Sequence, residues 1–182
     1  MIKTKADLQR FLAADRQALG KTGRPRLTGD AVWRFEIVLR KHEYYEYQSG
    51  LWAKMARHFY AWRHEQLGQK LGFDVPTRVF GPGLKINHHG SLVVSPNTRI
   101  GENCELYQGV HIGVDDQRTI LIGDNCKIGP GAKLTDHVSL GNGVEVEANA
   151  VVNHPFLHDH VKIAGTPATI VASCWGAKVV PI

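Results

Sequence analysis

The chain has 182 residues, which is enough for one ordinary domain or for one domain with a small appendage. It is 43% hydrophobic and 21% charged, the composition of a soluble globular protein, which argues against wholesale disorder. No apolar run reaches the ~18 residues that a membrane helix needs, and the segment from Met1 to Arg10 lacks the apolar core of a secretory signal. Three cysteines without a CxxC pair make a poor disulfide framework. We therefore expect a soluble, cytoplasmic protein.

The formal charge of +5 is unevenly distributed along the chain. Residues 1–72 hold 14 Lys and Arg against 7 Asp and Glu, whereas residues 73–182 hold 8 against 10. Because no Arg-rich run or basic-aromatic ladder accompanies this excess, we do not expect nucleic-acid binding. The positive charge of residues 1–72 is compatible with acidic or lipid-phosphate-linked acceptors near a membrane surface. It is equally compatible with a face that contacts another subunit of an oligomer.

Ten of the 15 aromatic residues fall in residues 1–72, while 13 of the 19 glycines follow that segment. This shift predicts an N-terminal helical region over 1–72, a second unit over 73–172 and a tail over 173–182.

Apolar residues at helical spacing predict three helices in the N-terminal region. The first covers about residues 4–19, the second begins at Asp30 as a capping residue and runs to about Tyr47, and the third runs from Leu51 to a stop at Gly72. An apolar stripe on the third helix is expected to be core rather than a ligand site: Trp52, Met55, Phe59 and Trp62. The histidines of this region are expected to be solvated or capping: His42, His58 and His64.

The rest of the chain is a six-residue repeat. Aliphatic residues recur at Val94, Ile100, Leu106 and Ile112, and again at Ile122, Ile128, Leu134, Leu140, Val146 and Val152. A compact residue lies two positions before most of them: Thr98, Cys104, Val110, Cys126, Ala132, Val138, Val144 and Ala150. The pattern predicts a triangular solenoid of short parallel strands in which residues 18 apart stack at ~4.8 Å. Its narrow interior excludes large aromatic rings, which explains their scarcity after residue 72.

Two irregularities interrupt the repeat. Ten positions separate Ile112 from Ile122, so four inserted residues are expected to bulge out around 114–119, and loops on rigid scaffolds often carry function. With these four residues subtracted, Cys104 lies above Cys126 inside the prism, and both are expected to be reduced, small apolar side chains. Counting back six from Val94 places His88 in an aliphatic position, either as an irregular polar cap of the first coil or as a proton acceptor at a prism edge.

The motifs resemble the serine acetyltransferase group of hexapeptide-repeat acyltransferases over about residues 73–172. They are GPGLKINHHGSLVV (81–94), QGVHIG (108–113), IGDN (122–125), IGPGAK (128–133) and AGTPATI (164–170). The resemblance implies a mainly β fold, a left-handed parallel β-helix preceded by a small helical region. It also implies a homotrimer with active sites between subunits, and acetyl-CoA as co-substrate without a metal.

In that group an Asp-His pair supplies the general base and a second His lies in a loop. Here the pair is Asn87-His88, and Thr119 stands where the second His would be. Among short relatives the chain looks most like O-acetyltransferases of capsule and exopolysaccharide synthesis. We therefore expect transfer of acetyl to a hydroxyl of a surface-polysaccharide sugar or its precursor, with L-serine O-acetylation for cysteine biosynthesis as the alternative. A non-catalytic hexapeptide scaffold is the second alternative.

The resemblance also assigns the remaining site residues. His88 is the expected general base, and Asn87 or a backbone carbonyl fixes its tautomer. Residues expected to contact the acceptor are Arg118, Asp116, His89 and His111. Residues expected at acetyl-CoA are Gly129, Pro130, Gly131, Lys133, Ala148, Asn149, Lys162 and Thr169.

Two further possibilities follow from the sequence. Zinc carbonic anhydrases share such hexads, but no two histidines in 73–182 are five positions apart, and the loop with His154, His158, Asp159 and His160 is expected to be solvated. The terminal Ile182 is a weak match to the C-terminal isoleucine by which serine acetyltransferases dock into cysteine synthase.

Overall fold

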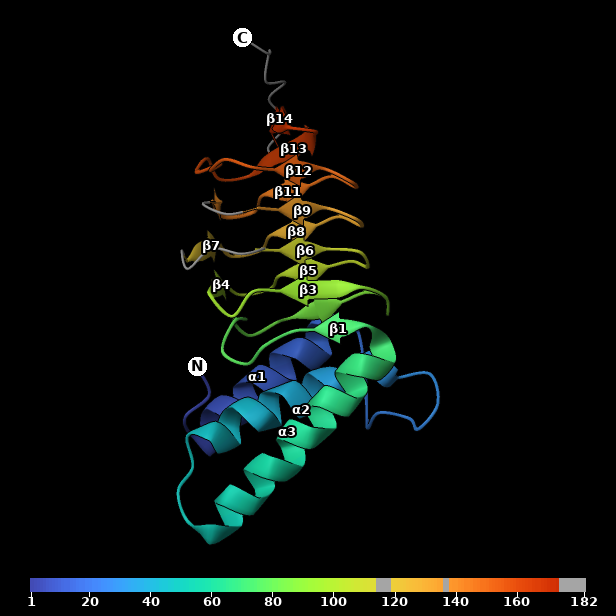
Figure 1. The fold of residues 1–182 in the computed structure, drawn as a ribbon, viewed down its shortest axis with the longest axis vertical. Helices are drawn as coiled ribbons and strands as arrows, with labels where there is room; N and C mark the ends of the chain where they lie inside the picture. Colours follow the sequence, from blue (N-terminus) through green and yellow to red (C-terminus); the bar gives the residue numbers. More distant parts are fainter. Residues whose placement is uncertain (114–118, 136–137, 174–182) are drawn as a thin grey trace.

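Three helices precede a solenoid of short strands in the computed structural model, which describes residues 1–113, 119–135 and 138–173. Figure 1 shows the helices gathered at one end of the solenoid, whose coils stack away from them towards the C-terminus. Within the described ranges, no helix has the length and apolar character needed to cross a bilayer. The predicted left-handed parallel β-helix with an N-terminal helical region is confirmed.

The strands form the three faces of a prism. The first face consists of β1 (Phe73–Asp74), β3 (Leu92–Val94), β6 (His111–Ile112), β9 (Lys133–Leu134) and β12 (Val151–Val152). The second consists of β4 (Thr98–Ile100), β7 (Ile120–Ile122) and β10 (Ser139–Leu140). The third consists of β2 (Lys85–Ile86), β5 (Glu105–Leu106), β8 (Lys127–Ile128), β11 (Glu145–Val146), β13 (Val161–Gly165) and β14 (Ala168–Ser173). These pairs are parallel except the last, β13 with β14, which is antiparallel.

The predicted interior of the solenoid is confirmed. All ten aliphatic repeat residues and all eight compact residues two positions before them are buried. Cys104 and Cys126 are both buried free thiols, on coils joined by the pairing of Glu105 with Lys127. Burial raises the pKa of the Cys104 thiol well above its usual value, so this side chain is a neutral packing group.

The insertion after Ile112 is also confirmed by the register. Leu121 pairs with Ser139, 18 positions away, whereas Thr98 pairs with Ile120, 22 positions away. The register therefore accommodates four additional residues between β6 and β7. Asp116 and Arg118 of this loop lie outside the described residues.

The three predicted helices are present as α1 (Lys5–Ala18), α2 (Ala31–Glu46) and α3 (Leu51–Leu71). Thr4 begins α1 with a capping box, and Gly72 ends α3 in the left-handed conformation with φ 75°, as predicted. Asp30 occupies the position before α2, but its side chain makes no capping hydrogen bond there. Its carboxylate instead accepts hydrogen bonds from Lys21 and Arg26, so its predicted capping role is wrong.

Buried charges join the helices to the first coil. The guanidinium of Arg40 donates to Asp15 Oδ2 (2.7 Å) and Oδ1 (3.1 Å) and to the carbonyl of Gly81 (2.7 Å). Glu36 Oε1 accepts a hydrogen bond from the backbone N–H of Ile86 (3.0 Å). Since buried charges are tolerated when they are paired and hydrogen-bonded, this network fixes the first coil onto α1 and α2.

The apolar stripe of α3 is not part of the core, contrary to the sequence prediction. Trp52 is 80% exposed, Met55 55%, Phe59 53% and Trp62 53%. The buried residues of α3 lie instead near its C-terminus: Leu67, Gly68 and Leu71. Helical spacing alone identified an apolar stripe and could not decide which of two apolar faces meets the core.

Because these side chains are exposed, replacing them with polar residues should cost little stability. We expect Phe59→Gln to change the free energy of unfolding by less than about 1 kcal/mol. The matched control is Phe35→Ala, since Phe35 is fully buried against Phe73 at 5.0 Å between ring centroids, and its loss should cost about 3–5 kcal/mol. Urea denaturation followed by circular dichroism measures both, and equal losses would mean that the α3 face is covered in solution.

The sequence predicts that His42 and His64 are solvated or capping residues. In the structure they contact each other instead, with their Nδ1 atoms 3.2 Å apart. Burial, and then the nearby His42, lower the pKa of His64 to about 4. In the unfolded chain a histidine titrates near 6.5, so acid favours unfolding as the pH falls from about 6.5 to about 4, and stability is retained above this window. Across this pH window, we expect the free energy of unfolding of wild type to fall by about 3 kcal/mol more than that of His64→Gln. Urea titrations at both pH values test this, with exposed His58→Gln as the control.

Candidate functional site

His88 lies in the loop between β2 and β3, at the end of the solenoid that faces the helices. The aliphatic position of the first coil is filled by Ile86, which is buried and pairs with Leu106. Eight positions separate Ile86 from Val94 instead of six, and the two additional residues push His88 outward. The prediction that His88 replaces an aliphatic residue is therefore wrong. His88 and His89 are both exposed.

His88 opens into a pocket of about 390 Å³ between the first coil and the helical region. The coil contributes Lys85, Ile86, Asn87, His88 and His89. The helical region contributes Leu19, Lys21, Gly29, Asp30, Val32 and Trp33. Sequence reasoning missed this second wall, because only the packing of the helical region against the coil brings together residues that are 52 to 70 positions apart. Mixed charges beside an exposed imidazole suit a small polar ligand.

Asn87 is held by a carboxylate of the next coil. Its amide donates to Glu105 Oε1 (2.8 Å), which also accepts hydrogen bonds from Lys85 Nζ (3.1 Å) and the Tyr107 hydroxyl (2.8 Å). Partial burial raises the pKa of Glu105, but the hydrogen bonds from Tyr107, Asn87 and Lys85 outweigh it and keep the pKa below its usual value. An ionised carboxylate therefore fixes the residue that precedes His88.

Asp30 is the acidic group of the pocket wall. Its carboxylate accepts hydrogen bonds from Lys21 Nζ (2.7 Å), the Arg26 backbone N–H (2.9 Å) and Arg26 Nε (3.2 Å). The bond from Lys21, followed by that from the Arg26 backbone, holds the pKa of Asp30 well below its usual range. These bonds tie the segment between α1 and α2 over the pocket.

His111 lies close to the same loop, since its Nε2 is 3.3 Å from the hydroxyl of Ser91. It pairs in register with Lys133, whose Nζ donates to the carbonyl of Gly109 (2.9 Å). Partial burial, and then the charge of Lys133, lower the pKa of His111. The structure thus places this predicted acceptor contact beside the His88 loop.

The residues expected at acetyl-CoA lie mostly along one prism edge, the edge between the third and first faces. The His88 loop begins this edge, and Gly109, Gly131 and Asn149 continue it, with Gly131 N–H donating to Gln108 O (2.9 Å) and Asn149 N–H to Pro130 O (2.8 Å). A Cβ added at Gly109 would lie 3.2 Å from the Cα of Gly131. Glycine is therefore favoured at this edge because successive coils stack closely there.

Lys162 and Thr169 lie further along, on β13 and β14. Lys162 Nζ is 2.8 Å from Glu147 and 3.3 Å from Glu145, so its charge is already paired. Of the histidine-rich loop, Asp159 Oδ1 accepts a hydrogen bond from the backbone N–H of Asn142 (2.6 Å). Within residues 1–113, 119–135 and 138–173, no group of three or more His, Cys, Asp or Glu is arranged to hold a metal ion. Ile182 lies outside the described residues.

Comparison with known proteins agrees with this architecture. Residues 119–154 match the family model described as bacterial transferase hexapeptide (six repeats). The chain is 30% identical over 105 residues to a serine acetyltransferase of Mycobacterium tuberculosis, covering 55% of this chain and 45% of that protein. It is 29% identical over 126 residues to a serine acetyltransferase of Salmonella typhimurium, covering 66% and 46%. The chain thus spans about half the length of these curated relatives.

Solved structures with a similar fold include the serine acetyltransferase from Brucella abortus, with a TM-score of 0.72 and 22% identity over 93% of this chain and 72% of that one. The same enzyme in complex with coenzyme A gives a TM-score of 0.71 at 21% identity, over 93% and 69%. The alignment includes the helical region as well as the solenoid. The resemblance is confirmed: this chain carries the hexapeptide repeat of bacterial transferases on the fold of the serine acetyltransferases.

Proposed function

We propose that the protein is an acetyl-CoA-dependent O-acetyltransferase of the serine acetyltransferase type, with His88 as its general base. The observation that carries the proposal is the position of His88. Its exposed imidazole lines a polar pocket and lies at the start of the prism edge on which Gly109 and Gly131 lie. An acceptor in the pocket and a thioester along the edge would therefore meet at this histidine.

The chemistry requires a base because a hydroxyl is a weak nucleophile until its proton is removed. His88 accepts that proton as the hydroxyl oxygen attacks the thioester carbonyl. The carbon–sulfur bond then breaks, and the imidazolium returns its proton to the departing thiolate. Asn87, held by Glu105, fixes the backbone that carries the imidazole. Cys104 and Cys126 take no part, since both are buried in the prism.

L-Serine is the acceptor that the comparisons favour over a polysaccharide hydroxyl, because the matching curated proteins are named serine acetyltransferases. Lys21, Lys85 and Asp30 line the pocket, but Lys21 is paired with Asp30 and Lys85 with Glu105, so the choice of acceptor rests on the comparisons. Glycan hydroxyls are the second acceptor class, since Asn87 and Thr119 replace charged or titratable residues of the family motif.

The proposal includes a homotrimer with active sites between subunits, the assembly that the family resemblance implies. Asp116 and Arg118 lie outside the described residues, so their contact with the acceptor stays a prediction.

The proposal is tested by thiol detection of CoA release from acetyl-CoA with L-serine, D-serine, L-threonine and a panel of free sugars. Release that depends on L-serine and exceeds hydrolysis is expected, and acetyl-CoA binding is checked separately by equilibrium dialysis. A protein that binds acetyl-CoA but uses only a sugar would reject the serine assignment. A protein that does not bind acetyl-CoA would reject the acetyltransferase itself.

A further inference from the structure

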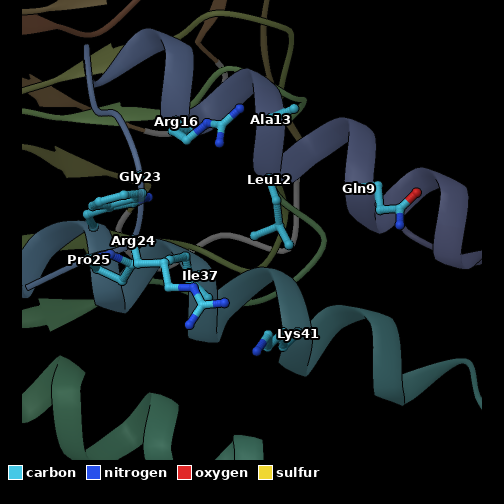
Figure 2. A pocket seen from close by; sticks show the side chains of 10 residues that line it. Gln9, Leu12, Ala13, Arg16, Gly23, Arg24, Pro25, Ile37 and Lys41 are labelled. Carbon is cyan, nitrogen blue, oxygen red and sulfur yellow. The ribbon is translucent and has the colours of Figure 1, made fainter.

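A second cavity of about 400 Å³ lies between α1 and α2 (Figure 2). The first helix contributes Gln9, Leu12, Ala13 and Arg16, and the following segment contributes Gly23, Arg24 and Pro25. The second helix contributes Trp33, Ile37 and Lys41. Their spacing explains the groove: each helix presents one face at intervals of three or four residues, and the segment 23–25 closes one end.

The groove combines an apolar floor with a cationic rim. In Figure 2, Leu12 projects from α1 towards α2, where Ile37 lies, while the side chain of Arg16 lies beside α1 and that of Arg24 beside α2. Lys41 lies on the same face of α2 as Ile37, one helical turn further along. No carboxylate is among the residues that line the groove.

These cations differ from others nearby, which are paired. Arg40 is bound to Asp15, and Lys21 is bound to Asp30. In the described part of the chain, Arg16 and Arg24 form no ion pair, and the charge of Lys41 lies over the ring of Tyr60 at 5.4 Å. The lining of the groove holds three cations and no carboxylate, so its charge complements an anion.

We propose that this groove binds an amphipathic anion, with its phosphate or carboxylate at Arg16, Arg24 and Lys41 and its apolar body over Leu12 and Ile37. Guanidinium groups bind such heads through two parallel hydrogen bonds, which favours arginine at this rim. The volume admits a short alkyl chain or one aromatic ring. This inference concerns binding and does not depend on acetyl transfer.

The groove is connected to the His88 pocket through shared walls. Trp33 lines both cavities, and the segment between α1 and α2 supplies Arg24 to one and Lys21 and Asp30 to the other. A ligand in the groove therefore contacts the same elements that close the pocket beside His88. Its binding is expected to change the NMR signal of the His88 ring without contacting it.

Titration calorimetry with octyl phosphate below its micellar concentration tests the proposal. Wild type should bind octyl phosphate more tightly than either inorganic phosphate or octyl glucoside, because the groove recognises head and chain together. Octanoate in place of octyl phosphate distinguishes a carboxylate head from a phosphate head. The double variant Arg16→Gln/Arg24→Gln should bind octyl phosphate at least tenfold more weakly.

Two control variants distinguish this groove from other surfaces. Lys54→Gln/Arg57→Gln removes two exposed charges of α3 and should leave the affinity unchanged. Trp52→Gln/Phe59→Gln removes the exposed apolar face of α3, the other place where an alkyl chain could adsorb, and should also leave it unchanged. Equal weakening by a control pair, equal affinity for octyl glucoside, or no binding of octyl phosphate would each overturn the proposal.

Discussion

Replacing His88 with alanine is expected to lower kcat for acetyl transfer by about 10²–10⁴-fold, the contribution of a positioned general base. The substitution removes the imidazole that takes the hydroxyl proton, and His89 follows it on the same loop. Because the side chain is exposed, the fold should be unaffected. Steady-state assays with the acceptor identified by the panel measure the loss, and circular dichroism checks the fold.

His89→Ala is the matched control, since His89 is also exposed and lines the same pocket. It should reduce kcat by less than tenfold. Affinity for acetyl-CoA should be the same in wild type and both variants, because the residues expected to contact acetyl-CoA lie on later coils. Turnover by His88→Ala at the wild-type rate would remove His88 from the mechanism, and no turnover by any form would favour a non-catalytic scaffold.

The solenoid could be predicted from the sequence because its interior is too narrow to tolerate alternatives. Each coil admits one aliphatic residue and one compact residue per face, so Ile128 and Ala132 have fixed places and the repeat is visible in the sequence. The same rigidity made the insertion after Ile112 visible as a change of register. The position of His88 was not predictable, because at the first coil the chain takes two extra residues and the hexad count from Val94 fails.

The pocket and the α3 face depend on tertiary packing, which the sequence pattern does not encode. Asp30 was expected to cap a helix because aspartate often does so, yet Lys21 and Arg26 compete successfully for its carboxylate. Trp52 and Phe59 have the spacing of core residues, yet both are exposed, while Tyr60 on the same helix stacks on Tyr45 of α2. One feature of the sequence pointed to the pocket wall. The short segment between α1 and α2 is basic and contains only one acidic residue, Asp30.

Replacing Arg40 with methionine is expected to lower the free energy of unfolding by about 3–5 kcal/mol, the cost of leaving buried charges without their partner. The guanidinium is fully buried and binds Asp15, Gly81 O and Phe80 O (2.9 Å), while Glu43 Oε2 lies 3.7 Å away. Methionine fills part of the volume and supplies none of these donors. Urea denaturation at pH 7 measures the loss, and the exposed Arg57→Met should change stability by less than about 0.5 kcal/mol.

The pH dependence of this loss distinguishes lost pairing from lost packing. Burial raises the pKa of Glu36 well above its usual value, with repulsion from Asp15 adding to it, and burial also raises the pKa of Glu43. A carboxyl whose folded pKa exceeds its unfolded value favours the folded state when protonated, and this contribution is lost as the pH rises through the folded pKa. Removing Arg40 takes away the charge that lowers both pKa values. The cost of Arg40→Met should therefore be smaller at pH 5 than at pH 7, whereas a purely steric defect would cost the same at both.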